Sequence, residues 1–272
     1  MPGTNKPPLG SRVNWGHPLT NGLRVCALIN EVAGSACVDI ASGRPFLLAY
    51  GNKDRRVNAI YGASGNTARW QSDVVLNYDN ISVMAVVVPY DSSQSFVDIV
   101  SRFDASSSPR AFTLGIGGAA GQWRWLIVDS GGNKSISSAA GYSVGSPVIL
   151  VGTANNLNYR FFVNGQETGT AGATTGLSTS TSGGLALLGR LNDGGPASTQ
   201  FKGEIRLTYV WSRALTPTEV AWLAAEPYAF IAPPAPYRKW FVPETISVVG
   251  QPIILRTATI PNLGGSLRQT RF

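Results

Sequence analysis

The sequence predicts an all-β protein: an antiparallel β-sandwich of the jelly-roll type, with one short C-terminal helix and extended terminal arms. Residues 201–211 alternate bulky apolar and polar side chains with a period of two, which is typical of a strand with one buried and one solvent-exposed (wet) face. Residues 92–195 are broken by runs of Gly, Ser and Asn, as expected of short strands joined by tight turns. Only 14% of the residues are charged, against ~25% in typical globular domains, while 43% are hydrophobic.

The period of the sequence changes after this strand. Thr216 precedes a proline and stands three residues before Glu219, which is the pattern of a capping box with Pro at the first helical position. The sequence therefore predicts a short helix over residues 217–225, which ends before Pro227.

Four motifs follow one another in a recognisable order. GLRVCALINE at residues 22–31 reads as an opening strand, ISVMAVVVPY at residues 81–90 as a central strand, and RFFVNG at residues 160–165 as a strand and turn. FKGEI, a strand and WSRALT close the series at residues 201–216. This order resembles that of laminin-G-like (concanavalin A-like) jelly-roll domains. The resemblance covers residues 14–230. Outside it, Pro2, Pro7 and Pro8 predict an extended N-terminal arm at 1–13, and the prolines and basic residues of 231–272 predict an extended C-terminal arm.

The formal net charge of +7 comes mainly from arginine, which supplies 17 of the 22 basic residues. These arginines are scattered and form no basic run interleaved with aromatics, so we expect no nucleic-acid partner. Arginine suits fixed contacts with carboxylates or phosphates, although it can also simply decorate a sandwich surface. No signal peptide or run of 18 apolar residues is visible, which predicts synthesis in a cytoplasm and no membrane partner.

The two cysteines, Cys26 and Cys37, fall in an expected hairpin. Their spacing would allow a cross-strand disulfide, but a reducing compartment favours two buried thiols.

Catalytic motifs are missing from the sequence. The single histidine, His17, precedes a proline and has no nucleophile motif beside it, so we expect a structural role. Glycoside hydrolases need a pair of carboxylates, whereas no two acids here stand two residues apart in an expected strand. The isolated acids are Asp98, Asp104, Asp129, Glu167 and Glu204. The sequence thus predicts a protein that is not an enzyme.

The family resemblance implies two kinds of ligand. Ca²⁺ at a sandwich edge would use loop oxygens, for which Asp91, Asn192 and Asp193 are the weak candidates; residues 192–195 also suit a simple turn. No other cofactor is expected. A glycan would stack on exposed aromatics, and Trp123 and Trp125 share one face of an expected strand, although that face can equally belong to the core.

The segment after residue 230 is too apolar for a solvated tail and too interrupted by proline for central strands. We expect an arm that lies on a neighbouring subunit or another protein; a belt over its own domain is the alternative. The residues predicted to contact the partner are Tyr237, Arg238, Lys239, Trp240, Phe241, Ile253, Ile254, Leu255, Arg256, Arg268 and Arg271.

The WGHPL opening, the sandwich, the EPYAF-x-x-PP exit and the basic tail together resemble small structural proteins of tailed bacteriophages. The resemblance implies a virion protein made in the host cytoplasm, most simply a capsid decoration or cement protein fastened by its arms. Its partners would be other capsid or tail proteins, and itself as a homo-oligomer. The alternative is a glycan- or receptor-binding module of a tail fibre or adhesin.

Overall fold

The computed structural model describes residues 6–31, 35–50, 55–56, 59–62, 69–73, 76, 78–102, 112–118, 121–129, 132–171, 184–188, 201–234, 245–248 and 251–254. Its elements are β1 (Arg12–Val13), η1 (Pro18–Thr20), β2 (Leu23–Ala27), β3 (Ala36–Val38), β4 (Pro45–Tyr50), β5 (Arg55–Arg56), β6 (Ala59–Gly62), β7 (Arg69–Ser72), β8 (Ile81–Pro89), β9 (Val97–Arg102), β10 (Phe112–Ile116), β11 (Gln122–Asp129), β12 (Gly132–Gly141), β13 (Val148–Ala154), β14 (Tyr159–Val163), β15 (Gln166–Ala171), β16 (Leu185–Leu187), β17 (Gly203–Trp211), α1 (Pro217–Ala225), β18 (Ile231–Ala232), β19 (Thr245–Val248) and β20 (Gln251–Ile254).

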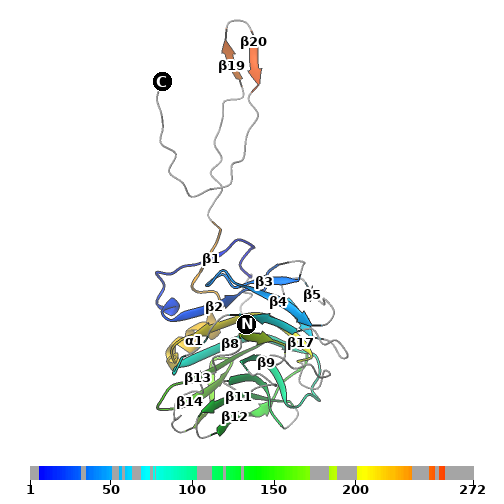
Figure 1. Cartoon of the computed structure of the whole chain (residues 1–272), viewed down its shortest axis with the longest axis vertical. Coiled ribbons are helices and arrows are strands. Elements are labelled where there is room, and N and C mark those ends of the chain that lie inside the picture. Colours follow the sequence, from blue (N-terminus) through cyan, green and yellow to red (C-terminus); the bar gives the residue numbers. More distant parts are fainter. Residues whose placement is uncertain are drawn as a thin grey trace. The chain divides into compact units, whose positions relative to one another are not determined.

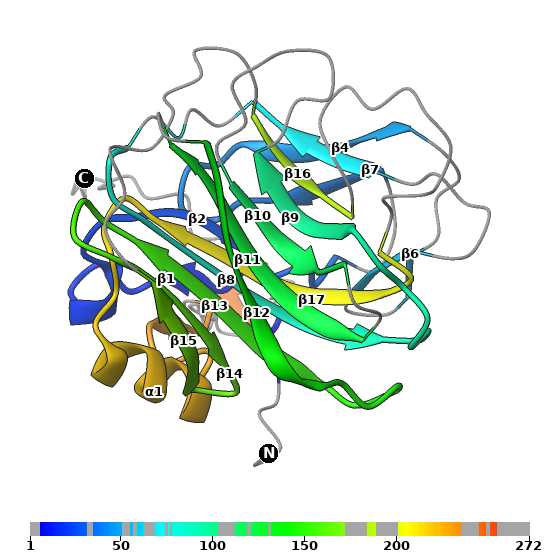
Figure 2. The ribbon, with the colours of Figure 1, turned by 90° about the horizontal axis from the view of Figure 1, so that it is seen from below.

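The described residues form two eight-stranded antiparallel sheets stacked face to face (Figures 1 and 2). One, here the β10 sheet, has the order β12-β11-β10-β9-β16-β7-β4-β3. The other, here the β8 sheet, has the order β15-β14-β13-β8-β17-β6-β5, with β2 also paired to β17. The predicted all-β sandwich is confirmed, and the motifs at residues 81–90 and 160–165 lie in β8 and β14.

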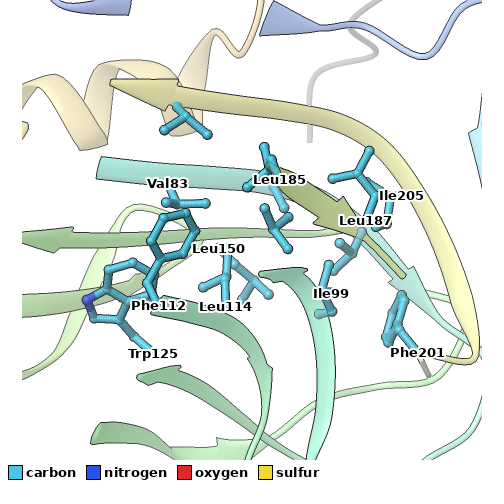
Figure 3. Packing of buried hydrophobic residues seen from close by; sticks show 14 of the residues in the cluster. Val83, Ile99, Phe112, Leu114, Trp125, Leu150, Leu185, Leu187, Phe201 and Ile205 are labelled. Carbon is cyan, nitrogen blue, oxygen red and sulfur yellow. The ribbon is translucent and has the colours of Figure 1, made fainter. Parts of the chain in front are cut away.

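The main apolar core fills the space between the two sheets. Figure 3 shows Trp125 and Phe112 of the β10 sheet packed toward Val83 and Leu150 of the β8 sheet. The ring centroids of Trp125 and Phe112 are 5.8 Å apart. Each such side chain contributes ~1.5–3 kcal/mol when it is fully buried, so this layer is the main source of stability.

A second apolar cluster covers the outer face of the β8 sheet. Leu207, Tyr209 and Trp211 of β17 pack there against Val220 and Leu223 of α1, and α1 lies on the side of the β8 sheet away from β9 and β10 (Figure 2). The prediction of one wet face on this strand is therefore wrong, because both of its faces are buried. Ile205 and Val210 pack in the core between the sheets, whereas the helix and the N-terminal segment cover Leu207, Tyr209 and Trp211. The register shift between Ile205 and Leu207 moves Ile205 to the opposite face from Leu207.

Helix α1 begins and ends as the sequence predicts. The Thr216 hydroxyl accepts a hydrogen bond from the Glu219 amide at 3.3 Å, and Glu219 Oε2 accepts one from the Thr216 amide at 2.9 Å. Arg213 donates to both carboxylate oxygens of Glu219, at 2.8 and 2.6 Å. These bonds, led by those from Arg213, lower the pKa of Glu219.

The chain divides into two compact units, Met1–Ala232 and Pro233–Phe272. At the ends of the first, β1 pairs with β18, and the Asn14 amide donates to the Phe230 carbonyl at 2.9 Å. In the second, β19 and β20 pair as an antiparallel hairpin. Among the described helices, none combines the length and apolarity that crossing a membrane requires.

The two cysteines are free, buried thiols. Cys26 packs in the outer cluster and Cys37 in the core between the sheets, so their side chains belong to different apolar layers. The pKa of Cys26 is raised well above its ordinary value, first by burial and then by the nearby Asp39 carboxylate.

Candidate binding face

An exposed phenylalanine marks one end of the β10 sheet. Phe96 immediately precedes β9, is 55% exposed, and has a φ of 51°. This left-handed region is unfavourable for a bulky side chain, because Cβ then crowds the backbone. The surrounding structure must therefore hold Phe96 in place.

A hydrogen-bonded loop supplies that support. Asp91 pairs with Lys202 at 2.8 Å, and the Gln94 side chain bridges the same segments. Its Nε2 donates to the carbonyls of Asp91 and Lys202 at 2.8 and 3.1 Å, and its Oε1 accepts from the Lys202 amide at 2.6 Å. The Tyr142 hydroxyl donates to the Asp91 carbonyl at 2.8 Å. The loop before Phe96 is thus fixed to two separate parts of the chain, at Lys202 and at Tyr142.

Two glycines lie in the stretch beside the ring, and Gly118 makes room for it. A Cβ at Gly118 would lie 2.7 Å from Cζ of Phe96, closer than real Cβ atoms approach other atoms. A Cβ at Gly117 would lie 3.1 Å from Oγ of Ser137. Gly117 also accepts a hydrogen bond from the Phe96 amide at 2.9 Å. The glycine-rich stretch after β10 therefore seats the aromatic ring.

A buried ion pair lies beside the ring. Trp123 and Trp125 point into the core, so Arg124 between them points to the outer face of the β10 sheet. Its Nη2 is 3.5 Å from Oδ1 of Asp98, which is fully buried. The Arg124 guanidinium carbon is 5.8 Å from the centre of the Phe96 ring, within the range of a cation–π interaction.

We call Phe96, Asp98, Gly118, Arg124 and Ser137 the Phe96 face. It combines an exposed aromatic ring with a cation, a carboxylate and a hydroxyl in a supported frame. The exposed Phe96 ring can stack against the flat side of a ligand ring and the exposed Ser137 hydroxyl can hydrogen-bond to its polar substituents, while the buried Arg124–Asp98 pair lies beside the ring. Sequence reasoning missed Phe96, because neither its backbone angle nor its distance from Arg124 is visible in the pattern.

Of the three calcium candidates, the structure describes only Asp91. Asp91 already accepts hydrogen bonds from the Lys202 ammonium group at 2.8 Å and from the Ser93 amide and hydroxyl at 2.8 and 2.6 Å. These bonds, first that from Lys202, lower its pKa to about 2. Asn192 and Asp193 lie outside the described residues. No group of three metal-ligating side chains occurs in the part of the chain that the structure describes.

The tryptophans proposed for glycan stacking are not available to a ligand. Trp123 and Trp125 are both buried in the core between the sheets (Figure 3 shows Trp125). Nε1 of Trp125 donates to the Thr153 carbonyl of the opposite sheet at 3.2 Å. The alternative, that this period-two face belongs to the core, is the correct interpretation.

The isolated acids of the strands pair with basic side chains. Besides Asp98, Asp129 pairs with Lys134 at 2.8 Å and Glu204 with Arg206 at 3.0 Å. Oε2 of Glu167 lies 3.8 Å from Nη1 of Arg160, and Asp104 lies outside the described residues. His17 caps η1, where its Nδ1 accepts a hydrogen bond from the Leu19 amide at 3.2 Å.

Most of the predicted partner-binding residues cannot be placed. The backbones of Ile253 and Ile254 belong to β20. The other nine lie outside the described residues: Tyr237, Arg238, Lys239, Trp240, Phe241, Leu255, Arg256, Arg268 and Arg271.

The fold is similar to that of several solved structures. Trypanosoma rangeli sialidase in complex with sialic acid matches with a TM-score of 0.56 at 16% identity, over 77% of this chain and 33% of that chain. The receptor-binding domain of a botulinum neurotoxin, mosaic serotype C/D, matches with a TM-score of 0.56 at 17% identity, over 77% and 52%. HCR/D W1238A mutant matches with a TM-score of 0.58 at 14% identity, over 78% and 53%.

The chain thus spans about a third of the length of the sialidase chains and about half that of the receptor-binding domain. At these identities the likeness concerns the fold alone. A search of curated protein sequences found no significant match.

These similarities correct the prediction that the protein is not an enzyme. That prediction is wrong, because the similar structures include sialidases, which are enzymes. It rested on missing sequence motifs, and missing motifs do not exclude catalysis in a fold shared by enzymes and binding domains.

The family follows from the sequence itself. The laminin G model of the concanavalin A-like lectin/glucanases superfamily matches residues 62–221, which is more than half of the chain. The matched region runs from the end of β6 into helix α1 and contains the strands that build the Phe96 face. The chain belongs to the concanavalin A-like lectin/glucanases superfamily.

Proposed function

We propose that the protein is a recognition domain that binds a glycan, or the glycan of a receptor, at the Phe96 face. The observation that carries this proposal is the exposed Phe96 ring, held at a positive φ beside the Arg124–Asp98 pair. A residue in such a conformation raises the free energy of the fold by ~1–3 kcal/mol, and strain of this kind gathers at ligand-binding positions. Glycine would remove the strain, but it would also remove the ring.

The chemistry of the face fits a sugar. The apolar side of a pyranose ring stacks on an aromatic side chain, while its hydroxyl groups exchange hydrogen bonds with charged and hydroxyl side chains. The exposed hydroxyl of Ser137 can serve the second purpose, while Arg124, which is only 9% exposed, contacts the Phe96 ring. The shared fold of the botulinum neurotoxin receptor-binding domain adds support by analogy of fold.

Binding to immobilised glycans tests the proposal. Replacing Phe96 with Ala should weaken binding of a glycan found on an array by about 2- to 12-fold, because a stacked aromatic contributes ~0.5–1.5 kcal/mol. Leu9→Ala is the matched control, since Leu9 is a comparably exposed apolar residue outside the face. Equal glycan binding by wild type and Phe96→Ala, with the fold intact by circular dichroism, would contradict the proposal.

A second candidate function is that of a structural component of a tailed-phage virion, such as a capsid decoration or cement protein. The second compact unit, Pro233–Phe272, favours it, because a separate segment with its own hairpin suits attachment to other capsid or tail proteins or to further copies of the chain. A protein that binds only the assembled shell stabilises it by mass action. Cosedimentation of the full chain and of residues 1–232 with virions tests this role. Loss of attachment on truncation supports it, and unchanged attachment contradicts it.

A further inference from the structure

A polar cavity opens on the outer face of the β8 sheet, between the β13–β14 turn and the start of helix α1. Its volume is about 190 Å³, and its walls include Thr153, Asn155, Asn158, Arg160, Thr216 and Pro217. Since a water molecule occupies ~30 Å³ of the liquid, the cavity has room for about six water-sized groups. It lies on the other sheet from the Phe96 face and is a separate site.

Both walls of the cavity are held by hydrogen bonds. The Ser82 hydroxyl donates to the Arg213 carbonyl and accepts from the Leu215 amide, each at 2.8 Å, which fixes the loop before α1 to β8. In the opposite wall, Oδ1 of Asn155 accepts from the amides of Leu157 and Asn158 at 2.9 and 2.8 Å. The shape of the cavity is therefore set before a ligand arrives.

Arg160 brings positive charge and unused donors to this frame. It stands opposite Thr153 in the β13–β14 ladder. Its Nε is buried and has no hydrogen-bond partner. Its Nη1 is 3.8 Å from Oε2 of Glu167, too far for a hydrogen bond. The Arg160 side chain is 31% exposed and lines the cavity, so the accessible part of its guanidinium group is the part that can meet a ligand there.

The nearest acid of the helix does not compete for this charge. Glu219 is engaged by both donor groups of Arg213 and by the Thr216 amide. Its negative charge is compensated there, so the acid that an anion would compete with for the Arg160 charge is Glu167, whose Oε2 lies 3.8 Å from Nη1 of Arg160.

We infer that this cavity binds a small oxyanion, a carboxylate or phosphate group, with Arg160 as its charged partner. The planar fork of arginine matches both groups, because two parallel N–H donors can meet two oxygens. The half-buried Asn158 lies in the same wall, where a side-chain amide can donate to the anion. The first turn of α1 adds the positive end of its helix dipole.

A titration of ¹⁵N-labelled full-length protein tests this inference. Inorganic phosphate and acetate are added in separate arms at constant ionic strength, with sodium chloride as the balancing salt. We expect saturable NMR shifts at Arg160 Nε, at the Asn158 side-chain amide and at the amides of Leu215 and Thr216. Saturation by phosphate alone identifies a phosphate site and saturation by acetate alone a carboxylate site; both outcomes support an oxyanion cavity.

Variants separate the cavity from general charge effects. Arg160→Gln should weaken binding on the order of tenfold, since it removes a charge-assisted hydrogen bond, and Asn158→Ala should weaken it less. Arg44→Gln is the matched control, because it removes the same charge from an exposed pair with Asp73 elsewhere on the surface. Unchanged affinity in both folded cavity variants would overturn the inference, as would shifts that the chloride balance alone reproduces.

Discussion

At single residues, a positive φ has one of two explanations: a turn that requires it, or strain that the surrounding structure maintains. Four described residues other than glycine have a positive φ: Ile29, Phe96, Asn164 and Leu188. Asn164 stands in the turn after β14, where the sequence itself predicts a turn, and asparagine tolerates this region. Phe96 has no such tolerance, and more than half of its side chain is exposed, so apolar burial offsets little of its strain. Its conformation is therefore the strongest residue-level sign of function.

The strain at Phe96 can be measured by comparing two substitutions. Phe96→Gly should be more stable than Phe96→Ala by about 1 kcal/mol, because only glycine adopts a positive φ without crowding of Cβ. Both substitutions remove the ring, so the difference between their free energies of unfolding measures the backbone strain alone. Urea unfolding of the two variants measures it. Equal free energies of unfolding would show that Phe96 is not strained.

Gly152 on β13 should be essential for packing between the sheets. A Cβ there would lie 2.2 Å from the Trp125 ring, inside the core where neither group can move freely. We expect Gly152→Ala to lower the free energy of unfolding by about 1–3 kcal/mol, the usual range for overpacking. Gly16→Ala is the control, since its nearest neighbour would be 3.5 Å away and it has no positive φ. Thermal melting of the two variants should differ clearly, and equal melting would contradict this packing.

Among the elements, helix α1 shows how local sequence and tertiary contacts combine. The capping box fixes its first turn, while Arg213, from the end of β17, adds a bidentate ion pair to the same carboxylate. The first part is visible in the sequence at a spacing of three residues. The second is also close in sequence, and it attaches the helix to the sheet.

This geometry predicts a pH-dependent stability. Because the pKa of Glu219 is depressed in the folded state, its stabilisation is present above the unfolded value near 4.5 and is lost as the pH falls through the folded value. Glu219→Gln should reduce the free energy of unfolding by about 1 kcal/mol near pH 7, as loss of a cap does. Urea unfolding from pH 7 to pH 3 should show this difference shrinking.

The exposed pair of Arg44 and Asp73 provides the control for that experiment. Asp73→Asn removes an equivalent charge from a solvent-exposed contact, so its effect should be within ~0–1 kcal/mol at each pH. A Glu219 effect that stays constant down to pH 3 would mean that its charge does not stabilise the helix.

Individual elements were more predictable from sequence than their surroundings. The strand at β17 and the helix after it follow from periodicity and capping, both local properties. Both faces of β17 are buried, one in the core between the sheets and one in the outer cluster with α1, and period two cannot show that. The same limit applies to Trp123 and Trp125: alternation places them on one face, but only the opposite sheet makes that face the core. The pairing of Arg124 with Asp98 joins strands β11 and β9, so no sequence spacing indicates it.

The reactivity of the two thiols tests the packing of both apolar layers of the molecule. Cys26 and Cys37 are fully buried in different apolar layers, and burial raises the pKa of Cys26. Since the thiolate is the reactive form, both should react with a disulfide reagent such as Ellman's only after unfolding. A count of two thiols released by urea, with almost none before, is the expected result. Rapid reaction of either thiol in native buffer would contradict the burial.

The first compact unit should fold without the second. Both apolar clusters lie within Met1–Ala232, so removal of residues 233–272 deletes neither. We expect residues 1–232 to retain the near-ultraviolet circular dichroism and cooperative melting of the full chain. A truncated protein that melts without cooperativity would show that the second unit belongs to the same core.

The pairing of β1 with β18 has a consequence for how this body can be joined to other proteins. Arg12 stands opposite Ala232, so the first and the last strand that the structure describes in this unit are neighbours. A domain whose ends lie together can be inserted into a loop of a host protein without forcing that loop apart, and its own ends can be joined and reopened elsewhere. The sandwich is therefore suited to domain insertion, because its position within a longer polypeptide can change while its fold stays the same.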